Sequence, residues 1–321
     1  MKAILLPAIN ESLQVVDYPE PLPDKGFALI RIRAAALNHR DVYIAQGQYA
    51  GIKTPVIPGS DGAGEWEGRR VLIDPSMDWG QNARAQGLQY RILGMPDNGT
   101  FAQWVSVPVE NVHDCPAHLS FEQAAALPLA GVTAWRVLFT RCNLQKGEKV
   151  LITGIGGGVA LLAMQFALAA GAEVYVSSGS AEKIARAVSL GAAGGVNYRE
   201  DNWDKTLRAM AGGFDVVIDS AGGDGFAKLP ALCNPGARIG IYGGSMGKVN
   251  GLSPQILFWK QISIHGSTMG NAADFEAMLQ FVNQHRIIPV IDRVFGMDAV
   301  NEAYARMDQS EQFGKIVLQI P

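Results

Sequence analysis

The 321-residue sequence predicts an α/β protein in which a doubly wound parallel sheet interrupts an irregular β domain. A buried-strand pattern over 149–152 runs into a glycine-rich turn and then into an apolar helix, as in a βαβ unit. Strands and helices alternate from there to about residue 265, whereas residues 1–121 contain mainly short strands and turns. A last strand pattern at 315–318 suggests that the C-terminal tail rejoins the N-terminal domain.

Residues 1–121 predict an irregular antiparallel β domain. The segment 28–34 alternates apolar and polar residues over its second half, as a half-buried strand does, and 71–73 and 101–107 also have strand character. Glycines make 58–64 a predicted dense turn. The polar segment 74–100 predicts a long loop, and loops of that length are usually functional or mobile.

The rest of the chain predicts alternating helices and strands. Ser180 is placed to cap one helix, and Pro230 predicts a bend in another. The expected helices are 122–127, 133–141, 159–170, 181–190, 203–211, 226–233, 254–260, 273–282 and 298–307. The expected strands are 149–152, 172–178, 195–198, 216–219, 238–242, 262–265, 290–295 and 315–318.

The composition excludes several functional classes. A net charge of −3, without any lysine or arginine cluster, provides no basic field for nucleic acid or acidic membranes. The three cysteines are too few and too scattered for a disulfide framework or a cysteine zinc site. No apolar run predicts a secretory leader or a membrane span, so we expect a cytoplasmic protein with a small-molecule substrate.

The glycine-rich turn predicts a dinucleotide site. Gly154, Gly157 and Ala160 follow the spacing GxxGxxA, a variant of the commoner GxGxxG. The helix that begins at Gly158 and Val159 directs unpaired N–H groups and the positive end of its dipole toward the turn. The pyrophosphate of a dinucleotide is the usual anion there, and a plain packing turn is the alternative.

The end of the second strand favours NADPH over NAD(H). NAD-binding units usually place a carboxylate there for the ribose hydroxyls, whereas this chain has the hydroxyls of Ser178 and Ser180. Lys183 lies one turn into the next helix, where it can pair with a 2′-phosphate. Glu182 can face the same spot, although its neighbours indicate a solvent-exposed face.

Small residues follow the other predicted strands at the carboxyl edge of the sheet. They let a flat cofactor lie close to the backbone, in a cleft that we expect between two domains. One such turn alone would indicate packing, and the series favours a cofactor groove. The candidate cofactor contacts are Ser220, Gly243, Gly244, Ser267 and Thr268.

The whole chain resembles the medium-chain dehydrogenase/reductase superfamily. The resemblance rests on the glycine turn and on the segments 37–41, 58–64, 127–134, 190–192 and 314–317. It implies a Rossmann dinucleotide-binding domain at 123–263, inserted into a GroES-like irregular β-barrel domain at 1–122 and 264–321. It also implies a homodimer, through the sheet edge near 262–267.

The catalytic zinc ligands of the zinc-dependent members, Cys, His and Cys, match Asn38, Ser60 and Leu129 here. An amide oxygen, a hydroxyl and an isobutyl group do not replace two thiolates and an imidazole. The four-cysteine loop of structural zinc has no counterpart, because 74–100 contains no cysteine. His39 and Asp41 alone do not complete a site, so the sequence predicts no metal.

The zinc-free quinone oxidoreductase branch resembles the chain more closely. Its members carry residues that match Asn38, Asp41, Tyr43, Tyr49 and Thr133. They also hold the 2′-phosphate with residues matching Lys183 and Tyr198, which agrees with the preference for NADPH. The resemblance places Lys315 among the cofactor contacts as well. Segments 75–80 and 97–100 resemble a zinc-free subgroup still named after alcohol dehydrogenases.

Without a metal, the favoured reaction is hydride transfer from NADPH to a quinone or an α,β-unsaturated carbonyl, which stabilises charge itself. Asn38 is a candidate hydrogen-bond donor to the developing oxyanion, or its amide only stabilises a loop. Asp41 is expected to fix the geometry of the loop or of the cofactor. Tyr43 and Tyr49 are candidates for lining the substrate pocket or for proton donation.

Thr133 is expected at the nicotinamide and Trp79 at the pocket wall. Two alternatives remain open. One is a zinc-independent alcohol or aldehyde oxidoreductase. The other is an NADPH-binding protein without relevant turnover, like the crystallins and sensors of this superfamily.

Overall fold

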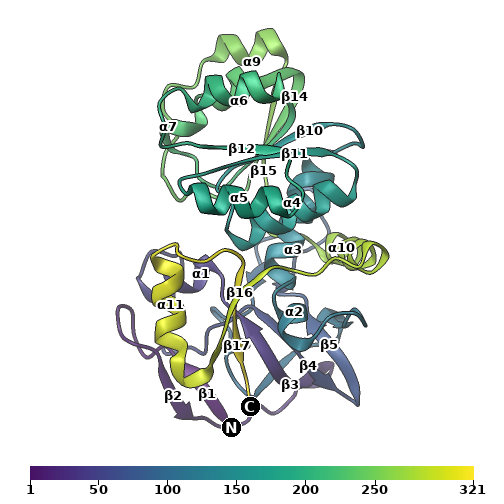
Figure 1. The fold of residues 1–321 in the computed structure, drawn as a ribbon. Helices are drawn as coiled ribbons and strands as arrows, with labels where there is room; N and C mark the ends of the chain where they lie inside the picture. The colour runs from purple at the N-terminus through teal and green to yellow at the C-terminus, as the bar shows by residue number, and fades with distance from the viewer. The chain divides into compact units, whose positions relative to one another are not determined.

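The computed structural model describes residues 1–321, which form two compact units (Figure 1). The first unit contains Met1–Val132 and Gly270–Pro321, and the second contains Thr133–Met269. The first unit is therefore built from both ends of the chain, and the second is a single continuous segment.

The second unit contains a six-stranded sheet in which every neighbouring pair is parallel. The sheet starts at its centre with β10 and grows first on one side and then, after a crossover, on the other. This is the predicted doubly wound arrangement, with its switch point between β10 and β13. In spatial order the strands are β12 (Gly194–Asn197), β11 (Glu173–Ser178), β10 (Lys149–Ile152), β13 (Phe214–Asp219), β14 (Cys233–Ile241) and β15 (Ser263–Gly266).

Helices cover both faces of this sheet (Figure 1). Leu151, Val217 and Ile239 from neighbouring strands are fully buried in one hydrophobic cluster. Residues 226–233, expected as one bent helix, instead contain the last residue of α7, the short helix α8 and the start of β14 at Cys233. The helices are α4 (Gly158–Ala169), α5 (Ala181–Ser189), α6 (Trp203–Ala211), α7 (Gly223–Phe226), α8 (Leu229–Leu232) and α9 (Pro254–Lys260).

The helical stretch ahead of the sheet has three parts. α2 (Phe121–Ala125) starts at Ser120, whose hydroxyl accepts from the N–H of Gln123 while the Gln123 side chain accepts from the N–H of Ser120. α3 (Pro128–Trp135) follows. The residues 136–141, expected as part of an α-helix, adopt a π-helical turn.

The first unit is built around β3 (Phe27–Ala36), which pairs antiparallel with three strands. β8 (Trp104–Pro108) pairs with the N-terminal part of β3, and β17 (Lys315–Gln319) pairs with the C-terminal part of β3. The C-terminal tail therefore rejoins the N-terminal domain, as predicted. The remaining strands are β1 (Lys2–Leu5), β2 (Gln14–Asp17), β4 (Asp61–Trp66), β5 (Arg69–Ile73), β6 (Ser76–Met77), β7 (Arg91–Ile92), β9 (Val112–Asp114) and β16 (Ile291–Gly296). The helices are α1 (His39–Ala45), α10 (Ala272–His285) and α11 (Val300–Asp308), with 3₁₀ turns at 109–111 and 297–299.

Two expectations for the first unit were wrong. The glycine-rich segment 58–64 is not all turn, because β4 begins at Asp61. Gly64 is needed for close strand approach instead: a Cβ there would lie 2.0 Å from the carbonyl oxygen of Arg31 on β3. The segment 74–100 is not one loop, because β6 and β7 within it pair antiparallel. Its polar composition concealed strands that are only two residues long.

No helix of the protein has the length and apolar character needed to cross a membrane.

Candidate functional site

A buried ion pair lies at the centre of the candidate site in the first unit. Lys315 Nζ lies 2.8 Å from Asp61 Oδ2, and both side chains are almost completely buried. The ammonium also donates to the carbonyl oxygen of Leu37 at 2.8 Å and to Asn38 Oδ1 at 2.7 Å. All three protons of Lys315 are therefore used within the protein, at the position that the resemblance assigned to the cofactor.

The Asp61 carboxylate is also fully engaged. Its Oδ1 accepts from the backbone N–H of Leu129 at 2.7 Å, and its Oδ2 accepts from Asn38 Nδ2 at 2.9 Å. One carboxylate therefore connects β4, the residue before α1 and the start of α3. The sequence analysis missed Asp61 as a site residue, because the predicted turn at 58–64 did not indicate that this carboxylate is buried and therefore needs a partner.

Asn38 and Asp41 together fix the start of α1. Asp41 Oδ2 accepts from the backbone N–H of Asn38 at 2.8 Å, while the Asn38 amide is bonded at both ends to Asp61 and Lys315. Asp41 is buried and its Oδ1 has no partner. Burial raises the pKa of the Asp41 carboxyl to about 6, although the neighbouring Arg40 and the Asn38 N–H oppose the shift.

The three positions that match catalytic zinc ligands in other members carry no metal-binding set. Asn38 is bonded as described, Leu129 contributes only a backbone N–H, and Ser60 Oγ donates to the carbonyl oxygen of Leu93 at 2.8 Å. No group of three or more His, Cys, Asp or Glu side chains is placed to share a metal ion. The residues present do not fit zinc.

Arg40 places a buried positive charge beside these residues. Its Nη1 donates to Ser60 Oγ at 2.7 Å and to the carbonyl oxygen of Leu93 at 3.0 Å, and its guanidinium lies 5.2 Å from the ring centroid of Tyr49. The Nε of Arg40 has no hydrogen-bond partner. Tyr43, one of the predicted pocket residues, is half-buried on α1 with its ring 6.3 Å from that of His39.

In the second unit, the glycine turn has the backbone that phosphate binding requires. Gly154 and Gly156 have φ values of +65° and +119°, a region that favours glycine. α4 begins after Gly157 without any side-chain cap, so the N–H groups of its first turn, at Gly158, Val159 and Ala160, are available to an anion.

Asp219 shapes the next turn of the same edge. Its carboxylate accepts from Thr153 Oγ1 at 2.6 Å and from the backbone N–H of Gly222 at 2.8 Å. This contact joins the ends of β10 and β13 and positions Ser220 beside Gly154, where a Cβ would lie 3.1 Å from the Ser220 hydroxyl. Position 243 also requires glycine, because a Cβ at Gly243 would lie 2.6 Å from the carbonyl oxygen of Ser220. Gly244 has open space around it.

A cluster of polar and basic side chains surrounds the end of β11. Ser180 Oγ caps α5 by accepting from the N–H of Lys183, and the Lys183 side chain lies over Gly156, where a Cβ would be 3.5 Å from Nζ. A Cβ at Gly179 would lie 3.0 Å from Tyr198 Oη and 2.7 Å from Arg199 Nε.

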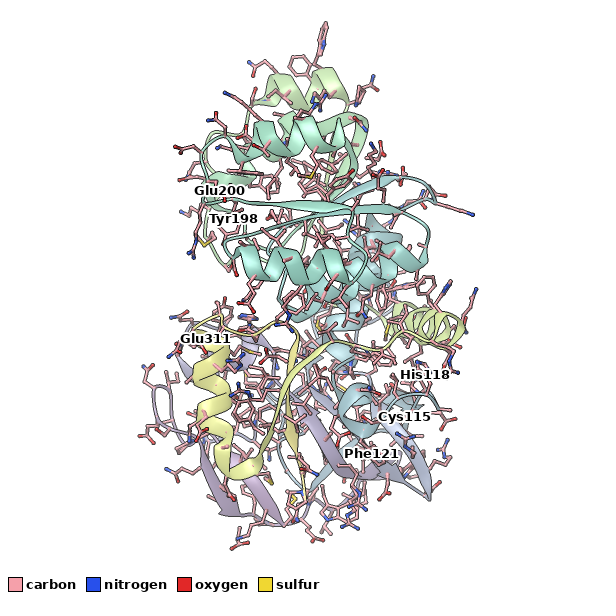
Figure 2. All side chains as sticks on the ribbon, viewed as in Figure 1. Cys115, His118, Phe121, Tyr198, Glu200 and Glu311 are labelled. Carbon is pink, nitrogen blue, oxygen red and sulfur yellow. The ribbon has the colours of Figure 1, made fainter.

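Tyr198 is 46% exposed at the surface of the second unit (Figure 2). Ser178, which is buried, accepts the N–H of Ser180 at 3.3 Å. Arg199 is a basic residue that sequence analysis missed. The sequence feature that could have identified Arg199 is its position directly after Tyr198.

At the end of β15, the buried Ser267 Oγ has no hydrogen-bond partner within the protein. Thr268 follows it at the surface, and Thr133 Oγ1 lies 3.9 Å from the sulfur of Met269. A buried hydroxyl without a partner, a glycine turn and uncapped helical N–H groups all fit a dinucleotide. The predicted cofactor residues, except Lys315, thus lie in the second unit, and the four predicted catalytic residues lie in the first.

Two family models match the chain: an alcohol dehydrogenase GroES-like domain at residues 24–117 and a zinc-binding dehydrogenase domain at residues 158–284. The zinc-type alcohol dehydrogenase-like protein YogA of Leptosphaeria maculans is 36% identical, covering 96% of this chain and 94% of its own.

Two solved structures are also similar. A crystal structure of an NAD-dependent alcohol dehydrogenase has a TM-score of 0.94 at 34% identity, covering 100% of both chains. The quinone oxidoreductase of Thermus thermophilus, solved alone and with NADPH, has a TM-score of 0.84 at 27% identity, covering 99% of this chain and 100% of its own.

We expect the Asp61–Lys315 pair to behave as a satisfied buried ion pair. Asp61→Asn leaves the Lys315 charge without its counterion, so the free energy of unfolding should fall by about 3–5 kcal/mol. The double variant Asp61→Leu/Lys315→Met should lose less than Asp61→Asn alone. Denaturant titrations measure both.

The exposed pair Arg69–Asp114 is the matched control, and Arg69→Met should cost less than about 1 kcal/mol. Equal losses from Asp61→Asn and Arg69→Met would contradict the assignment.

Proposed function

Because the chain belongs to the medium-chain dehydrogenase/reductase superfamily, we propose that it is a zinc-independent, NADPH-dependent reductase of quinones or α,β-unsaturated carbonyls. One observation carries this proposal: the side chains at all three zinc-matched positions are hydrogen-bonded protein groups or apolar, and none is a metal ligand. An acceptor that delocalises its own charge needs no Lewis acid.

The residues at the carboxyl edge of the second unit support the cofactor part of the proposal. The helical N–H groups after Gly157 would bind the pyrophosphate, and Lys183, Tyr198 and Arg199 would hold the 2′-phosphate. No carboxylate ends β11, where Ser177 and Ser178 stand. When bound, NADPH supplies the hydride.

The residues of the first unit support the acceptor part. The guanidinium of Arg40 is a fixed positive charge next to Ser60, and it favours negative charge that develops on an acceptor oxygen there. Tyr49, held against Arg40, offers an aromatic face and a hydroxyl for a planar acceptor. Asn38 positions this end of α1 through its bonds to Asp61 and Lys315.

A zinc-independent alcohol or aldehyde oxidoreductase is the second candidate. The similarity to an NAD-dependent alcohol dehydrogenase over the full length of both chains favours it. Binding of NADPH without turnover would be the third outcome.

The cofactor preference is tested by the basic cluster after β11. Lys183→Ala and Arg199→Ala should each raise the Kd for NADPH roughly 10-fold, because each removes a charge-assisted bond to the 2′-phosphate. The Kd for NADH should not change. Nicotinamide fluorescence titrations measure both constants, and Lys205→Ala, at an exposed position, serves as the control. Tighter binding of NADH than of NADPH by the wild type would refute the preference.

Substrate class and metal independence are tested in one assay. NADPH oxidation should proceed with 1,4-naphthoquinone and a simple enone, at rates unchanged after dialysis against a zinc chelator. Reduction of an aldehyde, or oxidation of an alcohol with NADP⁺, should be much slower. A chelator-sensitive rate would rule out the proposal, and tight NADPH binding with no acceptor used would favour the third outcome.

We also propose a homodimer through β15, an edge strand whose Ile264 is 37% exposed. On the adjoining α9, Phe258 and Trp259 are 65% and 84% exposed. Light scattering should give twice the chain mass for the wild type and the chain mass for Ile264→Asp. Val294→Asp on β16, the edge strand of the other sheet, should leave the mass unchanged. A monomeric wild type would exclude the dimer.

A further inference from the structure

We propose that a groove along β8 in the first unit binds an extended, positively charged peptide segment of a partner protein, which pairs with β8 as an added strand. The groove has a volume of about 560 Å³, and all of its lining residues belong to the first unit. None of the predicted catalytic or cofactor residues lines it. Peptide binding there needs neither cofactor nor acceptor, so it goes beyond the proposed function.

β8 has one unpaired edge. It pairs antiparallel with β3, from Phe27 opposite Pro108 to Arg31 opposite Trp104, and with no other strand. The free edge of a strand presents N–H and C=O groups that can bond a further strand. The groove runs along β8, because all five residues of Trp104–Pro108 line it.

A second wall of the groove is the connection between β2 and β3, where residues 18–22 and Asp24 line it. Proline occupies every second position of this connection, at Pro19, Pro21 and Pro23, and proline has no N–H to donate to a ladder. The connection therefore cannot close the groove by pairing with β8 as a strand. Space remains between the two walls for another chain.

The floor of the groove is apolar. Five of the lining residues are almost completely buried members of the hydrophobic core of the first unit. They are Ile57, Met77, Leu93, Val105 and Val107. An extended peptide directs every second side chain to the same face, so alternate apolar residues of the peptide fit against this floor.

The charged side chains of the lining favour a basic peptide. They comprise three carboxylates, of Glu20, Asp24 and Asp97, and one guanidinium, of Arg91. The guanidinium is already used, because Arg91 Nε lies 2.5 Å from Asp97 Oδ2 and its Nη1 bonds Asp78. The exposed carboxylates of Glu20 and Asp24 are thus left to pair with cationic side chains of the peptide.

The other cation of the lining is engaged as well, since the amino group of Met1 donates to the carbonyl oxygen of Tyr18 at 2.9 Å. A strand of the length of β8 spans roughly 17 Å, which corresponds to about six residues of a paired peptide. The groove therefore fits a short segment in which apolar residues face the floor and the basic residues between them face Glu20 and Asp24.

An acetylated and amidated hexapeptide of alternating lysine and valine tests the proposal on the wild-type protein. It should change the tryptophan fluorescence with a Kd of roughly 10–100 µM at low salt, and the Trp104→Phe variant should lose most of this response. The Kd should rise at least ~5-fold at about 0.5 M salt, because salt screens the contacts to Glu20 and Asp24. A hexapeptide of alternating glutamate and valine should not bind.

Amide hydrogen exchange tests the pairing with β8. In the complex, exchange of the β8 amides should slow at least ~5-fold, whereas exchange of β16, an edge strand of the same unit, should not change. Every second N–H of an added strand faces its neighbour. Of two lysine–valine peptides, N-methylated either at the valines or at the lysines, at least one should therefore bind ~10-fold more weakly.

Glu20→Gln/Asp24→Asn tests the charge of the groove. Both positions are exposed, so the variant should keep the stability of the wild type while its Kd for the lysine–valine peptide rises at least ~5-fold. Asp298→Asn/Glu302→Gln, at exposed positions of the first unit outside the groove, is the matched control and should bind like the wild type.

Four outcomes would overturn the proposal. The first is no binding of the lysine–valine peptide at about 1 mM, and the second is equal binding of the lysine and glutamate peptides. The third is binding that leaves exchange of the β8 amides unchanged, which would exclude strand addition. The fourth is a lower mass of Glu20→Gln/Asp24→Asn than of the wild type in light scattering, which would identify a second copy of the chain as the occupant.

Discussion

The buried ion pair between Asp61 and Lys315 is the contact on which the first unit depends. It joins β4 to β17, which come from opposite ends of the chain, and its two partners also bond the residue before α1 and the start of α3. A buried charge pair is favourable only when its remaining bonding capacity is satisfied. Here every proton of Lys315 has an acceptor, so the pair sets one arrangement of these segments.

This arrangement supports the proposed active site at the positions that match the catalytic zinc ligands of the zinc-dependent members. Asn38, Ser60 and Leu129 are brought together by hydrogen bonds of the protein itself, and the nearby positive charge is the guanidinium of Arg40. A fixed charge and oriented hydroxyls suit an acceptor that needs its new oxyanion stabilised, whereas a Lewis acid is needed to acidify an alcohol. The proposed function follows from that difference.

The second unit was largely predictable from sequence. The strand, glycine turn and helix from Lys149 to Ala169 depend on local propensity and on periodicity, which a sequence displays directly. The first unit was harder to predict from sequence, because its strands are short and some of their glycines permit close contacts between strands. Gly64 looked like part of a turn, yet it permits β3 and β4 to approach. Likewise Tyr198 and Arg199 lie near Gly179 only once β11 and β12 are paired.

The sequence by itself determined the fold class, and it predicted a dinucleotide site and no zinc-ligand set, because each depends on residue types at short spacing. Only the tertiary structure decided the partners of Lys315 and the hydrogen bond between Ser76 and Gly270. Lys315 is 254 residues from Asp61, and Gly270 is 194 residues from Ser76. Burial and charge pairing arise only when the chain folds, so no local pattern records them.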